Sequence, residues 1–202
     1  MRFCNPDLEW RIKQGEKIAL ELGSGSKREH KTRYALDLHP LDGVDIVADL
    51  NGKLDLIPDK CVTELYTRHT LEHVDNLVGL MEEIQRICVP GASITVIVPH
   101  FSNPLAHSDP THVRLFGIHT MFYFSDTSRQ PSRKVPTHYS TARFLVKDIG
   151  IRFYRNGWVD KTVAPFVERM VNLNWSTRTF YERYLAYVFP AWEIQFALVT
   201  ES

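Results

Sequence analysis

The sequence is poor in several features that would assign it to a specialised class of protein. Among 202 residues there are three cysteines, too widely spaced for a CxxC pair and too few for a disulfide framework: Cys4, Cys61 and Cys88. We therefore expect a reducing compartment, with the cytoplasm as the simplest location. The longest apolar runs, such as Ile94 to Val98, are of strand length and fall short of the ~20 residues that a membrane-spanning helix needs. We expect no transmembrane segment, and the first ten residues also lack the apolar core of a signal peptide.

The sequence also lacks a net charge. Its 24 basic and 24 acidic side chains cancel. Because phosphate contacts need a basic surface, we expect no nucleic-acid partner. A hydrophobic fraction of 44% with 24% charged residues is typical of an ordinary folded domain, and 202 residues suit one domain that spans the whole chain.

Short apolar runs separated by polar segments predict a parallel sheet in the first half of the chain. Between the last two runs, apolar residues recur at three- and four-residue spacing and predict a helix from Asn76 to Cys88, ended by Val89-Pro90-Gly91. The alternation predicts an α/β fold, a Rossmann-like three-layer sandwich with a mostly parallel, seven-stranded sheet. The five expected strands are Lys17 to Leu22, Tyr34 to Leu38, Val44 to Asp49, Cys61 to Thr67 and Ala92 to Val98.

The second half has a less regular pattern. Residues 101–136 are rich in His, Pro, Ser and aromatic residues, and we expect them to form an inserted lid or acceptor-binding segment after the fifth strand, partly helical near Leu115 to Phe124. Residues 163–200 should supply one or two helices and a last, antiparallel strand at Trp192 to Thr200, paired with a strand within Arg143 to Tyr154. Residues 1–16 are expected to be an N-terminal extension.

The most informative segment is Glu21-Leu22-Gly23-Ser24-Gly25, at the end of the first expected strand. Two glycines let the backbone turn sharply and approach a ligand. A lone GxG is as consistent with an ordinary strand-to-loop turn as with a nucleoside site. Asp37 ends the second strand, where it is placed to accept hydrogen bonds from ribose hydroxyls or simply to cap a turn. Asp49-Leu50 ends the third strand. Three successive predicted strands thus carry an acidic residue at or next to their last position, which favours a binding site at that edge of the sheet.

These segments together resemble the class I S-adenosylmethionine-dependent methyltransferases, specifically the small bacterial type 11-like group. The resemblance covers about the first half of the chain. The segments that carry it are Leu20 to Ser26, Asp37-Leu38, Val47 to Leu50, His69 to Val74 and Glu82 to Gly91.

The resemblance implies S-adenosylmethionine as the cofactor. It places the methionine part on the glycine turn, the ribose on Asp37, adenine beside Asp49 and Leu50, and the sulfonium near His69. The sequence departs from the family at Ser26, which replaces a third glycine, and in the short connection from Ser26 to Arg33, which cannot contain a normal first crossover helix. The cofactor-binding set expected from the resemblance is Glu21, Gly23, Ser24, Gly25, Asp37, Leu38, Asp49, Leu50 and His69.

Histidines are the candidates for a catalytic base, because methyl transfer to a hydroxyl requires a group that takes its proton near neutral pH. We expect His100 and His69 to be the catalytic residues, since each directly follows a parallel strand. In the related family the segment Leu71-Glu72-His73 starts a helix, so a structural role is favoured for Glu72 and His73.

A second histidine cluster lies in the expected lid. His107, Asp109 and His112 suit a divalent metal by their chemistry, but their spacing matches no standard ligand motif, and a hydrogen-bonded lid is favoured. The Asp-Pro-Thr-His pattern is similar to that of methyltransferases found with polysaccharide-building enzymes. We expect His107, His112 and Tyr123 to contact the acceptor. The two dense aromatic patches, at 116–124 and 180–192, favour core packing or a homodimer contact over an acceptor pocket.

The leading hypothesis is a methyltransferase that acts on a hydroxyl of a small molecule or glycan. A catalytically inactive cofactor-binding subunit is the non-enzymatic alternative. A nicotinamide-linked oxidoreductase ranks well behind, because the turn lacks the third small residue and the helix that would hold a pyrophosphate.

Overall fold

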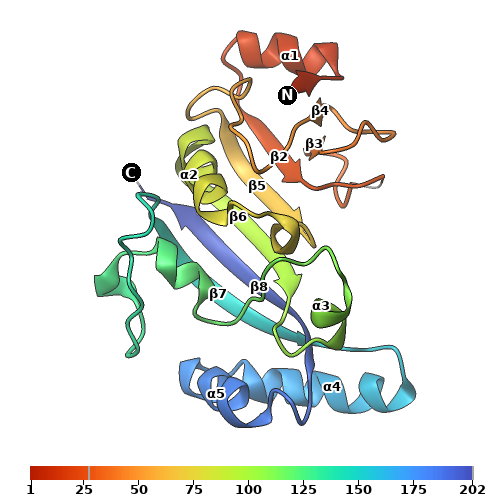
Figure 1. The fold of residues 1–202 in the computed structure, drawn as a ribbon, viewed down its shortest axis with the longest axis vertical. Helices are drawn as coiled ribbons and strands as arrows, with labels where there is room; N and C mark the ends of the chain where they lie inside the picture. Colours follow the sequence, from red (N-terminus) through yellow and green to blue (C-terminus); the bar gives the residue numbers. More distant parts are fainter. Residues whose placement is uncertain (27, 202) are drawn as a thin grey trace.

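A computed structural model describes residues 1–26 and 28–201 and shows one mixed sheet of eight strands (Figure 1). The strand order is β1-β4-β3-β2-β5-β6-β8-β7. The strands are β1 (Arg2–Phe3), β2 (Ile18–Leu22), β3 (Tyr34–Asp37), β4 (Ile46–Val47), β5 (Val62–Arg68), β6 (Cys88–Pro99), β7 (Phe144–Phe153) and β8 (Ala191–Thr200).

Strand direction confirms the predicted fold class. β4, β3, β2, β5 and β6 pair in parallel, and β8 runs antiparallel to both β6 and β7, as predicted for the last strand. The eighth strand is β1, which pairs antiparallel with β4 inside what the sequence suggested was only an extension. The carboxyl ends of β2, β5 and β6 therefore meet at one edge, beside α3 (Pro104–Ser108) (Figure 1).

The third predicted strand, Val44 to Asp49, is much longer than the observed β4. Asp45 is the reason, because its buried carboxylate accepts hydrogen bonds from Asn5 Nδ2 at 2.7 Å and Ala35 N at 2.8 Å. It also lies 3.0 Å from the Arg28 guanidinium. This side chain joins the N-terminal segment, β3 and the first connection at a position where a strand would place an apolar residue.

The predicted helix is present as α2 (Leu77–Ile87), and its apolar face is buried. Asn76 caps it by accepting a hydrogen bond from Gly79 N. The helix ends at Ile87, before Val89-Pro90-Gly91 as predicted, but the predicted start of the fifth strand at Ala92 is wrong, since β6 begins directly at Cys88. The other helices are α1 (Pro6–Lys13), α4 (Trp158–Val171), α5 (Trp175–Phe180), a π-helical turn at Tyr181–Leu185 and 3₁₀ turns at Leu71–His73, Thr120–Phe124 and Thr127–Arg129.

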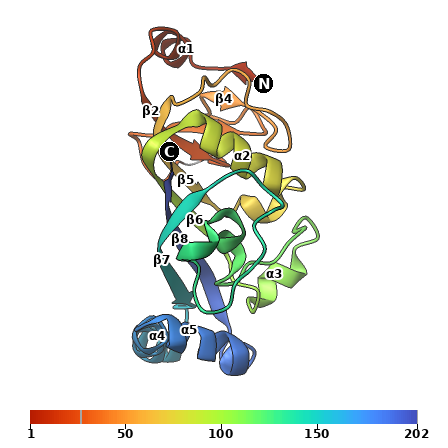
Figure 2. The same cartoon turned by 90° about the vertical axis from the view of Figure 1, so that its left-hand side faces the viewer.

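The layers on the two faces of the sheet are unequal. Figure 2 shows α2 and α3 on the same side of the sheet. Leu65, Val96 and Phe196, which the strand register places on one common face, are fully buried. On the opposite face the described part of the short first connection, which contains no helix, contacts β2 through Glu29 N and Glu21 Oε1 and contacts β5 through the Arg33–Glu64 pair. Farther along the sheet, Thr95 and Ala197 on that face are partly exposed. The short crossover predicted from the sequence thus leaves a thin third layer.

Residues 101–136 divide into two parts. Residues 104–112 lie at the carboxyl edge, whereas Phe116, Met121 and Phe124 are buried in the hydrophobic core. The first aromatic patch is therefore core, as expected. In the second patch Phe180, Tyr184 and Tyr187 are exposed.

Within the described residues, the helices are all too short or too polar to cross a membrane.

Replacing Asp45 should test its role as the N-terminal junction. We expect Asp45→Ala to lower the free energy of unfolding by about 3 kcal/mol, because it leaves a buried N–H and a guanidinium without their partner. Urea denaturation measures the change. The exposed Asp55 provides the control, and Asp55→Ala should stay within about 0.5 kcal/mol of the parent. Equal effects of the two substitutions would contradict the role of Asp45 in joining the N-terminal segment, β3 and the first connection.

Candidate active site

The turn after β2 brings the backbone against the end of β5. Gly23 and Gly25 both have positive φ, +66° and +58°, which only glycine adopts freely. A Cβ on Gly23 would lie 2.0 Å from Thr70 Oγ1, whereas one on Gly25 would meet nothing within 4 Å. Gly23 is therefore required both by its conformation and by the close approach of Thr70.

Asp37 fixes the same turn from β3. One of its carboxylate oxygens accepts a hydrogen bond from Gly25 N and the other from His39 N, each at 2.9 Å. Since a carboxylate oxygen has two acceptor positions, both oxygens can accept a further hydrogen bond from a ligand. The structure thus brings the predicted ribose residue to the glycine turn.

A cavity of about 290 Å³ lies along these strand ends, and we name it the glycine-turn cavity. Asp49 is exposed and lines it, with one oxygen accepting a hydrogen bond from Asn51 N at 2.9 Å. Leu38, 55% exposed although apolar, provides an uncovered hydrophobic wall. The residues lining this cavity are Gly23, Asp37, Leu38, His39, Asp49, Leu50, Asn51, His69, Thr70, His73 and Val74.

Three residues of the predicted cofactor set, Glu21, Ser24 and Gly25, do not line the glycine-turn cavity. Glu21 is buried, and its Oε1 accepts a hydrogen bond from Glu29 N at 3.0 Å, which holds the short first connection on the sheet. The Ser24 hydroxyl bonds only locally, to Gly25 O.

The remaining lining fits a nucleoside cofactor. Two carboxylates, Asp37 and Asp49, can accept hydrogen bonds from hydroxyl and amino groups, and Leu38 and Leu50 offer apolar surface to a planar base. Gly23 borders the cavity without a side chain, since the close approach of Thr70 leaves no room for one. These acceptors and apolar surfaces suit the adenosine of S-adenosylmethionine.

His69 follows β5 in a left-handed conformation with φ of +51°, which is strained for a residue with a Cβ. Its Nε2 lies 2.6 Å from Glu193 Oε1 on β8, and its Nδ1 lies 3.4 Å from Glu72 Oε1. Burial would lower the pKa of His69, but the hydrogen bond to Glu193 and the negative charge of Glu193 and Glu72 outweigh it and raise the pKa to about 9. His69 is therefore a cation at neutral pH and has no proton-accepting nitrogen free.

A second cavity, of about 470 Å³, shares His69 and His73 with the first, and we name it the polar chamber. Glu72 and His112 line it, from the 3₁₀ turn after β5 and the segment after α3. The structure thus joins two segments that the sequence analysis treated separately. The residues lining the chamber are His69, Glu72, His73, Pro99, Asn103, Leu105, Ser108, Asp109, His112 and Trp192.

His100 and His107 do not line the polar chamber. His100 is fully buried, with Nδ1 at 2.8 Å from Ser102 Oγ and Nε2 at 3.2 Å from Glu182 Oε1. His107 is exposed, and its Nε2 donates to Phe101 O at 2.8 Å. Because both ring nitrogens of His100 are engaged inside the core, its position does not favour a role as the base.

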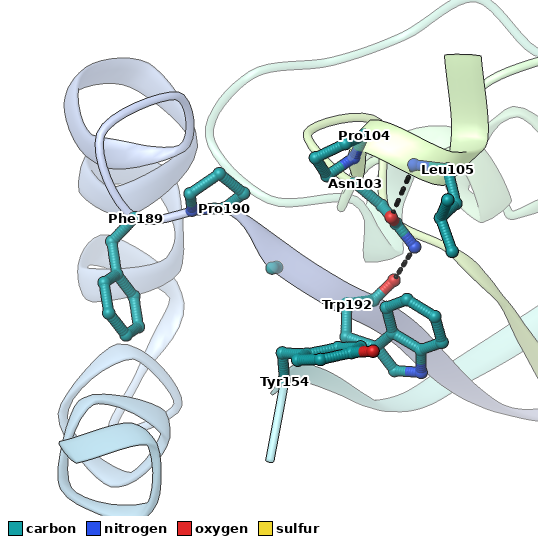
Figure 3. Close-up of a pocket in the computed structure, with 8 residues that line it drawn as sticks. Asn103, Pro104, Leu105, Tyr154, Phe189, Pro190 and Trp192 are labelled. Carbon is teal, nitrogen blue, oxygen red and sulfur yellow. Dashed lines mark hydrogen bonds between the residues drawn. The ribbon is translucent and has the colours of Figure 1, made fainter. Parts of the chain in front are cut away.

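A third cavity, of about 390 Å³, is largely apolar and shares Asn103, Leu105 and Trp192 with the polar chamber (Figure 3). The Asn103 side chain joins two segments of the cavity wall, because it donates a hydrogen bond to Trp192 O at 2.9 Å and accepts one from Leu105 N at 2.9 Å. The Tyr154 and Trp192 rings pack edge to face, with centroids 4.7 Å apart. We name it the apolar cavity; its lining is Asn103, Pro104, Leu105, Tyr154, Phe189, Pro190, Ala191 and Trp192.

The predicted acceptor residue Tyr123 lines none of these three cavities and packs near Tyr139, with ring centroids 6.4 Å apart. Sequence reasoning missed Glu193 and Asn103, and for the aromatic patch that contains Trp192 it weighed an acceptor pocket but favoured packing. It weighed Glu72 and His73 but favoured a structural role for both.

Comparison with known proteins shows the fold. No family model matches the chain, and no curated protein matches it by sequence. Among solved structures it is similar to an S-adenosylmethionine-dependent methyltransferase from Archaeoglobus fulgidus, with 16% identity, a TM-score of 0.58 and coverage of 96% of this chain and 94% of that one. A second, from Mesorhizobium loti, has 13% identity, a TM-score of 0.50 and 96% coverage of both chains. The [4+2]-cyclase SpnF is also similar, with 12% identity, a TM-score of 0.54 and coverage of 96% and 79%.

The two turn glycines form a matched pair for a stability test. We expect Gly23→Ala to lower the free energy of unfolding by about 2–5 kcal/mol, from left-handed strain and the clash with Thr70 together. Gly25→Ala adds the strain alone and should lower it by about 1–2 kcal/mol. Thermal or urea unfolding measures the loss of stability in both variants. A loss in Gly25→Ala as large as that in Gly23→Ala would contradict the close approach of Thr70 to Gly23.

Proposed function

We propose that this protein is an S-adenosylmethionine-dependent methyltransferase that methylates a hydroxyl of a small molecule or sugar. The observation that carries the proposal is the series of three adjoining cavities at the carboxyl edge of the parallel strands. The first has the lining expected for a nucleoside, the second is polar, and the third is apolar. The fold shared with methyltransferases of solved structure supports the same assignment.

The glycine-turn cavity is the proposed cofactor site. The adenosine lies across Gly23, Asp37 and Asp49, with the ribose hydroxyls donating to Asp37. The sulfonium then points toward His69 and His73, the two residues that also line the polar chamber. This orientation presents the methyl group to the chamber.

The polar chamber is the proposed place of reaction, and the apolar cavity holds the rest of the acceptor. The acceptor oxygen attacks the methyl carbon, the carbon–sulfur bond breaks, and sulfur keeps the electron pair. The hydroxyl proton is accepted by Glu72, His73 or His112, polar groups of the chamber that, unlike His69, are not held as cations by two carboxylates. Alignment of oxygen and methyl in a confined site accounts for most of the rate, since the reaction needs placement more than unusual groups.

The apolar cavity restricts the acceptor to a molecule with an apolar or ring-shaped part. The Tyr154 and Trp192 side chains offer the kind of surface on which planar rings and sugar faces pack. Phenolics, sugars and glycolipids all meet this requirement, and a role in polysaccharide synthesis is one form of the proposal.

We also place the protein in the cytoplasm, on the chemistry of its cysteines. All three are free thiols, and Cys61 and Cys88 are buried. Burial raises the pKa of Cys88 to about 12, which keeps it an unreactive thiol.

A screen with methyl-labelled S-adenosylmethionine tests the function. Sugars, glycolipids and phenolics are the acceptor panel, and transfer of label to a hydroxyl is the expected result. Cofactor binding by calorimetry with no transfer to any member would favour a catalytically inactive subunit. Preferential binding of NAD over S-adenosylmethionine would overturn the class.

Cofactor affinity tests the ribose assignment. We expect Asp37→Ala to weaken S-adenosylmethionine binding by about 1.5–3 kcal/mol, or roughly 10- to 150-fold, because hydrogen bonds to a charged group are lost. Asp42→Ala is the control, since Asp42 is exposed and outside the glycine-turn cavity. Calorimetry measures the S-adenosylmethionine affinity of both variants, and circular dichroism verifies that both are folded. An unchanged affinity in Asp37→Ala would refute the assignment.

Acceptor affinity tests the apolar cavity once an acceptor is known. We expect Trp192→Leu to raise the acceptor KM about 10-fold while the affinity for S-adenosylmethionine stays within about twofold, because the aromatic surface lies in the apolar cavity and not beside the cofactor. The exposed Phe180 lies outside the three cavities, and Phe180→Leu should change neither value. A loss of cofactor affinity in Trp192→Leu would mean that the two sites are not separate.

A further inference from the structure

The polar chamber contains a carboxylate without a hydrogen bond. Glu72 is 1% exposed, and neither of its carboxylate oxygens has a hydrogen-bond partner among the described residues. Its nearest charged neighbour, His69 Nδ1, lies 3.4 Å away in a geometry that makes no hydrogen bond. Since buried polar atoms are satisfied in nearly all folded proteins, this carboxylate indicates an external partner.

His112 directs a lone pair toward Glu72. Its Nδ1 lies 3.0 Å from Ala106 O, and because a carbonyl oxygen only accepts, Nδ1 carries the proton. In the neutral ring Nε2 is then unprotonated. That nitrogen lies 4.0 Å from Glu72 Oε1 and 3.8 Å from Asp109 Oδ2, too far for a direct hydrogen bond to either.

His73 is held in the same tautomer by a longer chain of hydrogen bonds. The Thr111 hydroxyl donates to Asp109 Oδ1 at 2.6 Å, so it has no proton left for His73. His73 Nδ1, which lies 2.9 Å from that hydroxyl and 3.3 Å from Thr111 O, is therefore the donor. The Nε2 of His73 is left with its lone pair, as in His112.

We propose that Glu72, His73 and His112 bind one divalent transition-metal ion in the polar chamber. Their potential ligand atoms all lie within 4.8 Å of one another. Two imidazoles with Nδ1–H fixed by oxygen acceptors, and Nε2 free, are the arrangement that metal-binding histidines adopt. The ion supplies the missing partner of the Glu72 carboxylate.

The ligand set selects the ion. Two imidazole nitrogens and one carboxylate suit Zn²⁺ or Mn²⁺, whereas Mg²⁺ prefers oxygen ligands and retained water. Metal–ligand bonds of about 2.1 Å require the ligand atoms to approach by roughly 1 Å, which rotation of the exposed His73 side chain allows. Three protein ligands leave a coordination position open to the chamber.

The ion has a role in catalysis if the proposed function holds. If the acceptor hydroxyl were bound at the open position, the ion would lower its pKa, and its proton would pass to solvent water in the chamber. His73 and His112 then act through the metal instead of accepting the proton themselves. Metal binding itself does not rest on methyl transfer.

Calorimetric titration with Zn²⁺ and Mn²⁺ tests the site. The full chain, without a polyhistidine tag and stripped of metal with a chelator, is titrated in the absence of S-adenosylmethionine. One saturable site is expected, with Mg²⁺ at least about tenfold weaker than Zn²⁺. No saturable site for Zn²⁺ or Mn²⁺, or Mg²⁺ binding as tight as Zn²⁺, overturns the proposal.

Variants identify the ligands. We expect Glu72→Gln, His73→Ala and His112→Ala each to weaken Zn²⁺ binding by about 100-fold or more. Thr111→Val, which removes the nearer of the two acceptors of His73 Nδ1–H, should weaken it by about 10-fold. The exposed His138 controls for adventitious surface binding, and His138→Ala should have no effect. His107→Ala should also have none, and a loss in that variant comparable to that of Glu72→Gln would move the site to His107, Asp109 and His112 and overturn this ligand set.

Two further measurements keep the two proposals separate. Circular dichroism and S-adenosylmethionine affinity, which we expect to be retained in Glu72→Gln, show that a loss of metal binding is not a loss of fold. Should an acceptor be methylated by protein that binds no Zn²⁺ or Mn²⁺, the metal site fails and the proposed function stands. Should metal bind as described while no acceptor is methylated, the metal site stands and the proposed function fails.

Discussion

The hydrogen bond between Glu193 and His69 joins the two halves of the site. Glu193 is buried on β8, and although burial alone would raise its pKa, His69 and Arg68 keep that pKa below the usual range. Its Oε1 lies 2.6 Å from His69 Nε2 and 2.8 Å from Arg68 Nη2, across 124 and 125 residues of sequence. This contact holds the end of β5 against β8. It therefore fixes the path of the chain after His69 and the orientation of the side chains that follow it.

The close packing at the carboxyl edge follows from that path of the chain. The left-handed conformation of His69 turns the chain so that Thr70 meets Gly23 and Glu72 enters the interior. His73 then lies between the glycine-turn cavity and the polar chamber, and the segment after α3 reaches it through Thr111 and Asp109. A change in the turn after β5 would therefore disturb both cavities together.

The glycine-turn cavity and the apolar cavity are formed mainly by different parts of the chain. The glycine-turn cavity is formed by the ends of β2, β3 and β4, which belong to the shared parallel sheet. The apolar cavity is formed by residues 103–105 together with Tyr154 and residues 189–192, which lie on either side of α4 and α5 in the sequence. Proteins of this fold include both methyltransferases and a [4+2]-cyclase, as expected if the reaction is decided mainly by the second group of residues.

Most of the fold could be predicted from the sequence because its signals are local. Apolar runs of strand length gave β2, β3 and β5 to within one residue at each end, and the three- and four-residue spacing gave α2. The prediction failed where a single side chain overrode the pattern. Asp45 shortens β4 by turning a strand position into a polar junction, and Val89-Pro90-Gly91 continues into β6 although proline and glycine usually end a strand.

The sequence by itself determined the glycine turn, Asp37 and Asp49, because each follows a strand whose position is set by local apolar content, and parallel strands place their ends at one edge. Only the tertiary structure decided which histidines share a cavity. His100 looked well placed at a strand end but is enclosed by Ser102 and Glu182, a residue 82 positions away. Glu72, His73 and His112 come together because the segment after α3 folds back on the turn after β5, through contacts between residues about 40 apart that have no periodic signal.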